Sequence, residues 1–115
     1  MNELLPLNER TLMLAHGARS KRGDDIDPFP VVKLFTPDGR ATWLLTELDP
    51  DDRDIAFGLC DLGMGSPELG AVRLSEIMAV RGSLGLPVER DAYFSPDRPL
   101  SAYAEKARVM GYIGV

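Results

Sequence analysis

The sequence predicts an α+β domain: an antiparallel sheet of about four to five strands with helices packed mainly on one face. Residues 31–74 carry short alternating runs of apolar and polar side chains separated by turn residues, which is typical of an antiparallel meander. Helical patterns precede and follow this meander instead of alternating with its strands. The length of 115 residues predicts a single domain spanning 1–115.

Composition and charge narrow the class of protein. The hydrophobic fraction of 44% and the charged fraction of 27% are those of an ordinary soluble globular protein. No apolar run reaches the roughly 18–20 residues of a membrane helix, and the start of the chain lacks the pattern of a signal peptide. The single cysteine, Cys60, fits a reducing compartment. We therefore expect a cytoplasmic protein with no membrane partner, and the net charge of −5 argues against direct nucleic-acid binding.

The elements follow in order from the local signals. We expect a short first helix that is capped by Asn8 and ended by Gly17. The polar run at 18–27, ARSKRGDDID, indicates a solvated loop. In the first hairpin, the segment 36–40 predicts a type I turn followed by Gly39 in the left-handed conformation.

That turn fixes the register of the hairpin. It pairs Thr36 with Arg40, and therefore Lys33 with Trp43 across the two strands. Alternation then assigns one largely apolar face to the core. The residues of this face are Val31, Lys33, Phe35, Ala41, Trp43 and Leu45.

The remaining strands and helices complete the sheet. The third strand, starting at Ile55, places Phe57 and Leu59 on one face and small residues on the other, where something can pack closely. A fourth strand is expected over Leu69–Leu74. Ser75 then caps a helix over SEIMAVRG, and Pro87 confines the next segment to an edge strand or an extended arm. A last helix is expected over Pro99–Met110.

One group of residues stands out as a candidate binding site. Lys33 interrupts the apolar face beside Trp43, within reach of a cation–π contact. Strand alternation extends the two faces to the carboxylates of Glu47 and Asp61. Glu68 lies where the next strand begins. The candidate rim consists of Lys33, Trp43, Glu47, Asp61 and Glu68. The plainer interpretation is a lysine stem lying along the indole while its ammonium reaches water.

No catalytic or metal-binding motif is found. In the acidic loop around Asp51, Pro50 and Arg53 break the alternation of ligands, and the glycine of a calcium loop is absent. His16 has no second histidine for a zinc site, and Cys60 is expected to be a packed side chain. The glycine-rich stretch lacks the lysine and hydroxyl of a phosphate loop. We therefore expect no catalytic residues, no metal and no cofactor.

Several segments together resemble a bacterial family called domain of unknown function 2958. They are VVKLFTPDG, TWLLTELDPDD, IAFGLCDLG, PELG, VRGSLGLPVERD and PLSAYAEKAR, which span nearly the whole chain. The resemblance implies a small cytoplasmic protein encoded on plasmids, phages or other mobile elements. It implies no activity and no catalytic residues.

These observations favour a non-catalytic protein-interaction or accessory module of mobile genetic elements, with another protein as its partner. One alternative is a small hydrolase or transferase that uses Glu47 or Asp61 as a base. A second alternative is an acidic mimic of nucleic acid that acts against host defence. The sequence leaves the oligomeric state open.

Overall fold

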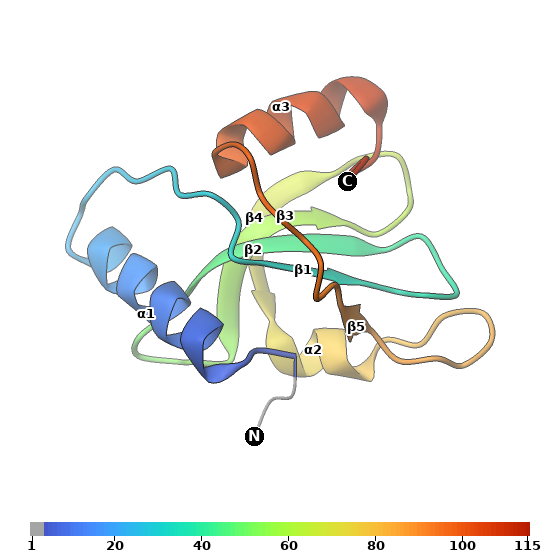
Figure 1. Ribbon diagram of the computed structural model, residues 1–115, viewed down its shortest axis with the longest axis horizontal. Helices are drawn as coiled ribbons and strands as arrows, with labels where there is room; N and C mark the ends of the chain where they lie inside the picture. Colours follow the sequence, from blue (N-terminus) through green and yellow to red (C-terminus); the bar gives the residue numbers. More distant parts are fainter. Residues whose placement is uncertain (1–3) are drawn as a thin grey trace.

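The computed structural model describes residues 4–115. Its elements are, in chain order, α1 (Leu7–Lys21), β1 (Val32–Phe35), β2 (Thr42–Leu48), β3 (Ile55–Asp61), β4 (Glu68–Arg73), α2 (Leu74–Ala79), β5 (Glu89–Arg90) and α3 (Leu100–Met110). The five strands form one antiparallel sheet in the order β4-β3-β2-β1-β5. The predicted α+β class and the meander are therefore confirmed (Figure 1).

The helices cover the two faces of the sheet unequally. α1 and α2 pack on the face that carries Trp43 and Leu45, which forms the larger hydrophobic cluster. α3 packs on the opposite face against Leu44 and Leu59. Figure 1 shows α3 above the sheet, α2 below it and α1 at its left. No helix within residues 4–115 combines the length and the apolar character that a bilayer span requires.

The predicted register of the first hairpin is wrong by one residue. Lys33 lies opposite Leu44, and Trp43 lies opposite Leu34. The hydroxyl of Thr36 accepts a hydrogen bond from the Ala41 N–H at 2.9 Å, so the turn closes between these two residues. Gly39 does not take a positive φ, because the loop has four residues and not three.

Because the register is shifted, the residues of β1 that face the core differ from those predicted. Val32 and Leu34 are the buried residues of this strand, in place of the predicted Val31 and Phe35. Trp43 and Leu45 lie in the core as predicted, because the shift falls on β1 alone. Lys33 therefore lies on the face opposite the indole.

The first helix is longer at both ends than predicted. It begins after Pro6 and continues through Gly17 to Lys21, so Asn8 is not its cap and Gly17 does not end it. Gly17 has a different role: a Cβ at this position would lie 1.8 Å from the carbonyl oxygen of Leu48. The missing side chain lets α1 lie directly against the end of β2.

A β-bulge in β2 explains the small residues of β3. The register between these strands shifts between Leu45 and Glu47, which leaves Thr46 as the extra residue. At the bulge, a Cβ on Gly58 would lie 2.0 Å from the carbonyl oxygen of Leu44. On the same face of β3, Ala56 is buried in the larger hydrophobic cluster and Cys60 packs against it, which confirms the predicted close packing.

The C-terminal half follows the prediction with one correction. β5 is an edge strand beside β1, and α3 buries Leu100, Tyr103 and Ala107 as its apolar stripe. α2 starts at Leu74, one residue before the predicted cap Ser75, and ends at Ala79, before Gly82. Its capping carboxylate comes from the β2–β3 loop: Asp54 accepts hydrogen bonds from the Ser75 N–H at 2.9 Å and from its hydroxyl at 2.7 Å.

Candidate functional site

The predicted rim does not form around Lys33 and Trp43. Trp43 is 2% exposed and belongs to the core beneath α1 and α2. On the other face, the Lys33 ammonium lies 3.4 Å from Asp91 and 5.7 Å from the centre of the Phe35 ring. The cation–π contact thus exists, but with a residue of the same strand.

The length of the sheet separates Glu47 from the other two carboxylates of the predicted rim, Asp61 and Glu68. Glu47 lies near the end of β2 opposite Phe57, whereas Asp61 lies opposite Thr42 at the start of that strand. Glu68 is exposed on the edge strand β4, opposite Cys60. Glu47 and Asp61 therefore occupy opposite ends of the sheet, and each lines a different cavity.

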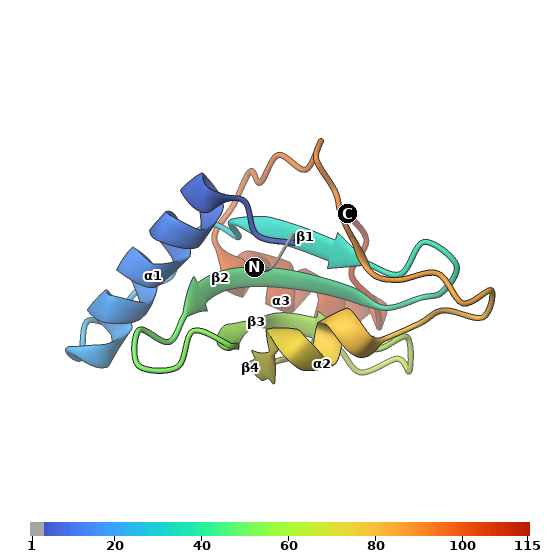
Figure 2. The same ribbon diagram turned by 90° about the horizontal axis from the view of Figure 1, so that it is seen from below.

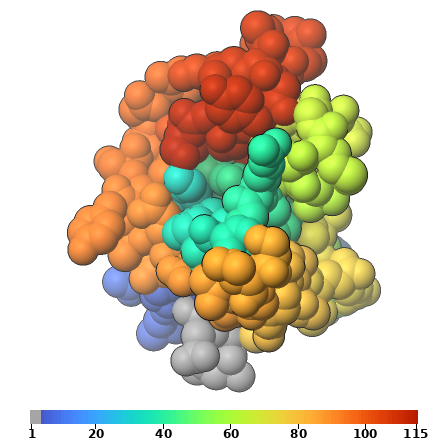
Figure 3. Space-filling view, turned by 90° about the vertical axis from the view of Figure 1, so that its right-hand side faces the viewer, coloured from blue at the N-terminus to red at the C-terminus, as the bar shows by residue number. Residues whose placement is uncertain are grey.

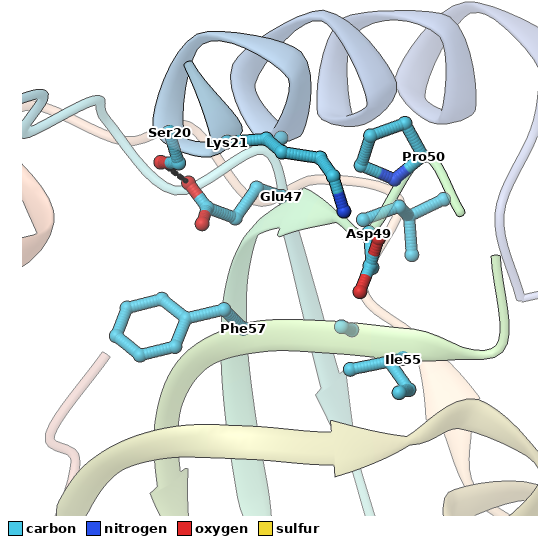
Figure 4. Close-up of a pocket in the computed structure, with 10 residues that line it drawn as sticks. Ser20, Lys21, Glu47, Asp49, Pro50, Ile55 and Phe57 are labelled. Carbon is cyan, nitrogen blue, oxygen red and sulfur yellow. Dashed lines mark hydrogen bonds between the residues drawn. The ribbon is translucent and has the colours of Figure 1, made fainter. Parts of the chain in front are cut away.

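Glu47 contributes to a cavity of about 280 Å³ between α1 and the β2–β3 strands. Figure 4 shows Ser20 and Glu47 on one side of this space, Asp49 on the other and Lys21 reaching over it. The Ser20 hydroxyl donates a hydrogen bond to Glu47 Oε2 at 2.9 Å. We call this space, bounded below by Phe57, the helix-side cavity.

The ammonium at the helix-side cavity is paired with a carboxylate that is not one of the lining residues. Lys21 forms an ion pair with Asp51. The hydrogen bond and the charge of Asp51 raise the pKa of Lys21, with a smaller contribution from Asp49. A hydroxyl, two carboxylates and an ammonium above an aromatic floor suit a small polar molecule.

Asp61 organises the other end of the sheet. It is 2% exposed, and its two oxygens accept backbone N–H groups from Gly63 at 2.8 Å and Ile113 at 3.0 Å. These bonds hold the β3–β4 loop and the segment after α3 against the end of β3. A cavity of about 410 Å³ lies beside them, between Arg40 and Tyr112.

A second carboxylate fixes the neighbouring loops at the same end. Asp38, in the β1–β2 loop, accepts hydrogen bonds from the N–H groups of Leu84 at 2.7 Å and Leu86 at 3.1 Å. A Cβ on Gly82 would lie 1.7 Å from Asp38 Oδ1, so this approach requires glycine. Desolvation raises the pKa of Asp38, but the amides of Leu86 and Leu84 outweigh it and lower that pKa below its usual value.

Large apolar side chains project from the loops that these two carboxylates hold. Met64 is 78% exposed and Leu84 is 80% exposed. Figure 3 views this end: the β1–β2 loop lies in the middle, the orange segment below it, the yellow-green β3–β4 loop beside it and the red C-terminal segment above. We define the loop-end surface as the exposed residues Arg40, Leu62, Met64, Leu84 and Tyr112.

The pKa shifts of the carboxyl groups are explained by the hydrogen bonds that these groups accept. Every resolved shift of a carboxyl pKa within residues 4–115 is downward, at Asp24, Asp38, Asp54 and Asp97. A lowered pKa keeps a carboxyl group ionised and able to accept hydrogen bonds. In the same part of the chain, no three His, Cys, Asp or Glu residues are placed to hold a metal ion.

The sequence reasoning found Asp61 but missed the loop-end surface to which it belongs. Strand alternation points to Asp61, but its hydrogen-bond partners lie 2 and 52 residues away. Asp38 was assigned only to a turn, although it binds a loop 46 residues further along the chain. One available signal was the gathering of Leu and Met beside glycines at 62–65 and 82–86.

Comparison with known proteins identifies the family. A family model described as "Protein of unknown function (DUF2958)" matches residues 4–114, nearly the whole chain, and the chain belongs to this family. No curated protein and no solved structure matches it.

Proposed function

We propose that this member of the DUF2958 family is a non-catalytic protein-interaction module that binds a partner protein through the loop-end surface. The observation that carries the proposal is the exposure of Met64 and Leu84 on loops that are tied to the sheet by buried or desolvated carboxylate contacts. Methionine and aromatic side chains are enriched at the cores of protein interfaces.

Preorganisation supports this choice of surface. A binding loop that is already held in place loses less conformational entropy when a partner docks. The β1–β2 loop and the segment 82–86 are joined through Asp38. The β3–β4 loop and the segment after α3 are joined through Asp61. Arg40 adds a cation beside the apolar side chains, which favours a partner with an acidic group at the edge of its interface.

The test is a comparative capture from native host lysate followed by mass spectrometry. The wild-type chain is compared with Met64→Asp and Leu84→Asp, each of which places a charge where an apolar contact is expected. A partner enriched by the wild-type chain should be lost with both variants. The matched control is Leu7→Asp, because Leu7 is 76% exposed at the start of α1, in a different part of the fold.

The control defines the result that would refute the proposal. Leu7→Asp should retain the partner at the wild-type level, and all variants should keep the wild-type circular dichroism spectrum. A partner retained by both loop-end variants, or no specific partner under any lysate condition, would contradict the proposal.

The proposal includes a cytoplasmic location and a role in mobile genetic elements. The free thiol of Cys60 supports a reducing compartment, and its burial raises its pKa to about 11. The association with mobile elements is supported only by the family resemblance. This association predicts that genes beside those of family members encode plasmid, phage or integration functions. A survey of gene neighbourhoods would test the prediction.

A further inference from the structure

The strand β4 forms one outer edge of the sheet, and no strand within the described residues 4–115 pairs with its outer side. It is the last strand in the order β4-β3-β2-β1-β5, and none of its six residues is buried. Figure 2 shows it at the lower rim of the sheet. The opposite edge is formed by β5, which has only two residues. The long edge therefore lies at β4.

The direction of the backbone groups of β4 follows from its pairing with β3. The Leu74 N–H donates to the Asp54 carbonyl at 2.7 Å, in the register that continues from Arg73 opposite Ile55. Backbone groups alternate in direction along an antiparallel strand. The N–H and C=O groups of Leu69 and Ala71 and the N–H group of Arg73 therefore point away from the sheet, whereas the Arg73 carbonyl, as the N-cap group of α2, accepts the first hydrogen bond of that helix.

The middle of this edge lacks the features that usually prevent strands from pairing, because the charged residues of β4, Glu68 and Arg73, lie at its two ends. Natural edge strands are commonly interrupted by proline, lysine or a bulge. The sequence of β4, ELGAVR, contains none of these, and six residue pairs with β3 follow one another without a shift. The middle of the strand carries the small residues Gly70 and Ala71, which leave room for another strand.

We propose that two copies of this chain associate by antiparallel pairing of their β4 strands around a two-fold axis at Ala71. In this register Ala71 faces Ala71 of the second copy, and Leu69 faces its Arg73. Every outward-pointing residue of one strand then meets an outward-pointing residue of the other. The two sheets join into one continuous sheet. The interface differs from the loop-end surface, so the two proposals can fail independently.

The charges of β4 are compatible with this register. Glu68 of one copy faces Leu74 of the second, and Arg73 faces Leu69, so no like charges lie directly opposite each other. Arg73 is already paired with Asp52 at 3.2 Å within its own chain. Leu69, which is 48% exposed in the single chain, gains cover from the second copy.

The experiment is sedimentation velocity of the full chain over a concentration series up to about 1 mM protein. The wild-type chain should shift from monomer to dimer as concentration rises. Ala71→Pro should remain monomeric, because its N–H points outward and the proline removes a donor from the open edge alone. Leu69→Lys, which faces Arg73 of the second copy, should weaken dimerisation at least about tenfold.

Leu7→Lys is the control of equal charge away from β4, and it should dimerise like the wild-type chain. Leu69→Lys keeps the test decisive if Ala71→Pro does not fold. A wild-type chain that stays monomeric throughout would overturn the proposal and leave the edge to a strand of another protein. A dimer that survives in both folded edge variants would also overturn it, because the interface would then lie elsewhere.

Discussion

Gly17 is the residue at which α1 comes closest to the sheet. Because a Cβ there would lie 1.8 Å from the Leu48 carbonyl oxygen, Gly17→Ala must push the helix away from β2. We predict a loss of about 1–3 kcal/mol in the free energy of unfolding, the usual cost of overpacking, measured by urea denaturation. Gly70→Ala is the control, since its Cβ would meet no atom within 4 Å. Equal stability of the two variants would refute this role of Gly17.

A second residue, Asp97, predicts that the free energy of unfolding depends on pH. Hydrogen bonds from Arg98 and then Tyr103 lower the pKa of Asp97 from 3.8 to about 2. The unfolded chain therefore binds more protons between these two values, so the free energy of unfolding rises with pH across this window. The stabilisation is complete above the window and is lost as pH falls through it.

Asp97→Asn should flatten the pH dependence of the free energy of unfolding in this window. The measurement is urea denaturation at several pH values between about 2 and 5. Asp25→Asn, which removes the same charge from an exposed position, serves as the control. If Asp97→Asn keeps the full wild-type slope, the hydrogen bonds of Asp97 do not contribute in solution.

Thr36 shows why residue-level prediction succeeded only in part. Turn propensity correctly located the first hairpin, and strand alternation correctly placed Trp43 and Leu45 in the core. The threonine hydroxyl, however, satisfies the Ala41 N–H and lengthens the loop by one residue. One added residue reverses the face of every side chain on β1, which removed Lys33 from the indole.

At the scale of elements, two helices begin with caps supplied from distant loops. Asp54 caps α2, and Asp27 accepts hydrogen bonds from the N–H and hydroxyl of Ser101 in α3. Capping rules that use only neighbouring residues place the cap of α2 at Ser75. The extent of α3 could still be predicted well, because its apolar stripe and Gly111 are local signals.

Asp27→Ala should destabilise the chain by about 1 kcal/mol, the usual cost of losing an N-cap. The reason is that the Ser101 N–H and hydroxyl of α3 lose their acceptor. Urea denaturation measures the change, and amide exchange at Ser101 should accelerate. Asp27→Asn, which retains one acceptor oxygen, should recover part of the stability. An Asp27→Ala variant as stable as the wild-type chain would show that water replaces this cap without cost.

At the scale of the whole molecule, one end of the sheet gathers loops from four parts of the chain. The sequence could not predict this arrangement, because its contacts join Asp38 with Leu84 and Asp61 with Ile113 across long separations. It could predict the meander that brings the loops to one end. The predicted rim failed for a related reason, since Glu47 and Asp61 belong to opposite ends of neighbouring strands.

The central claim is that the loop-end surface is held in one shape before any partner binds. Hydrogen exchange of the free chain, resolved at single amides, tests it most directly. The amides of Gly63, Leu84, Leu86 and Ile113 should exchange far more slowly than in an unfolded peptide, because each donates to a carboxylate. Exchange of these four amides at the unfolded rate would show that the loops are not held, and it would contradict the claim.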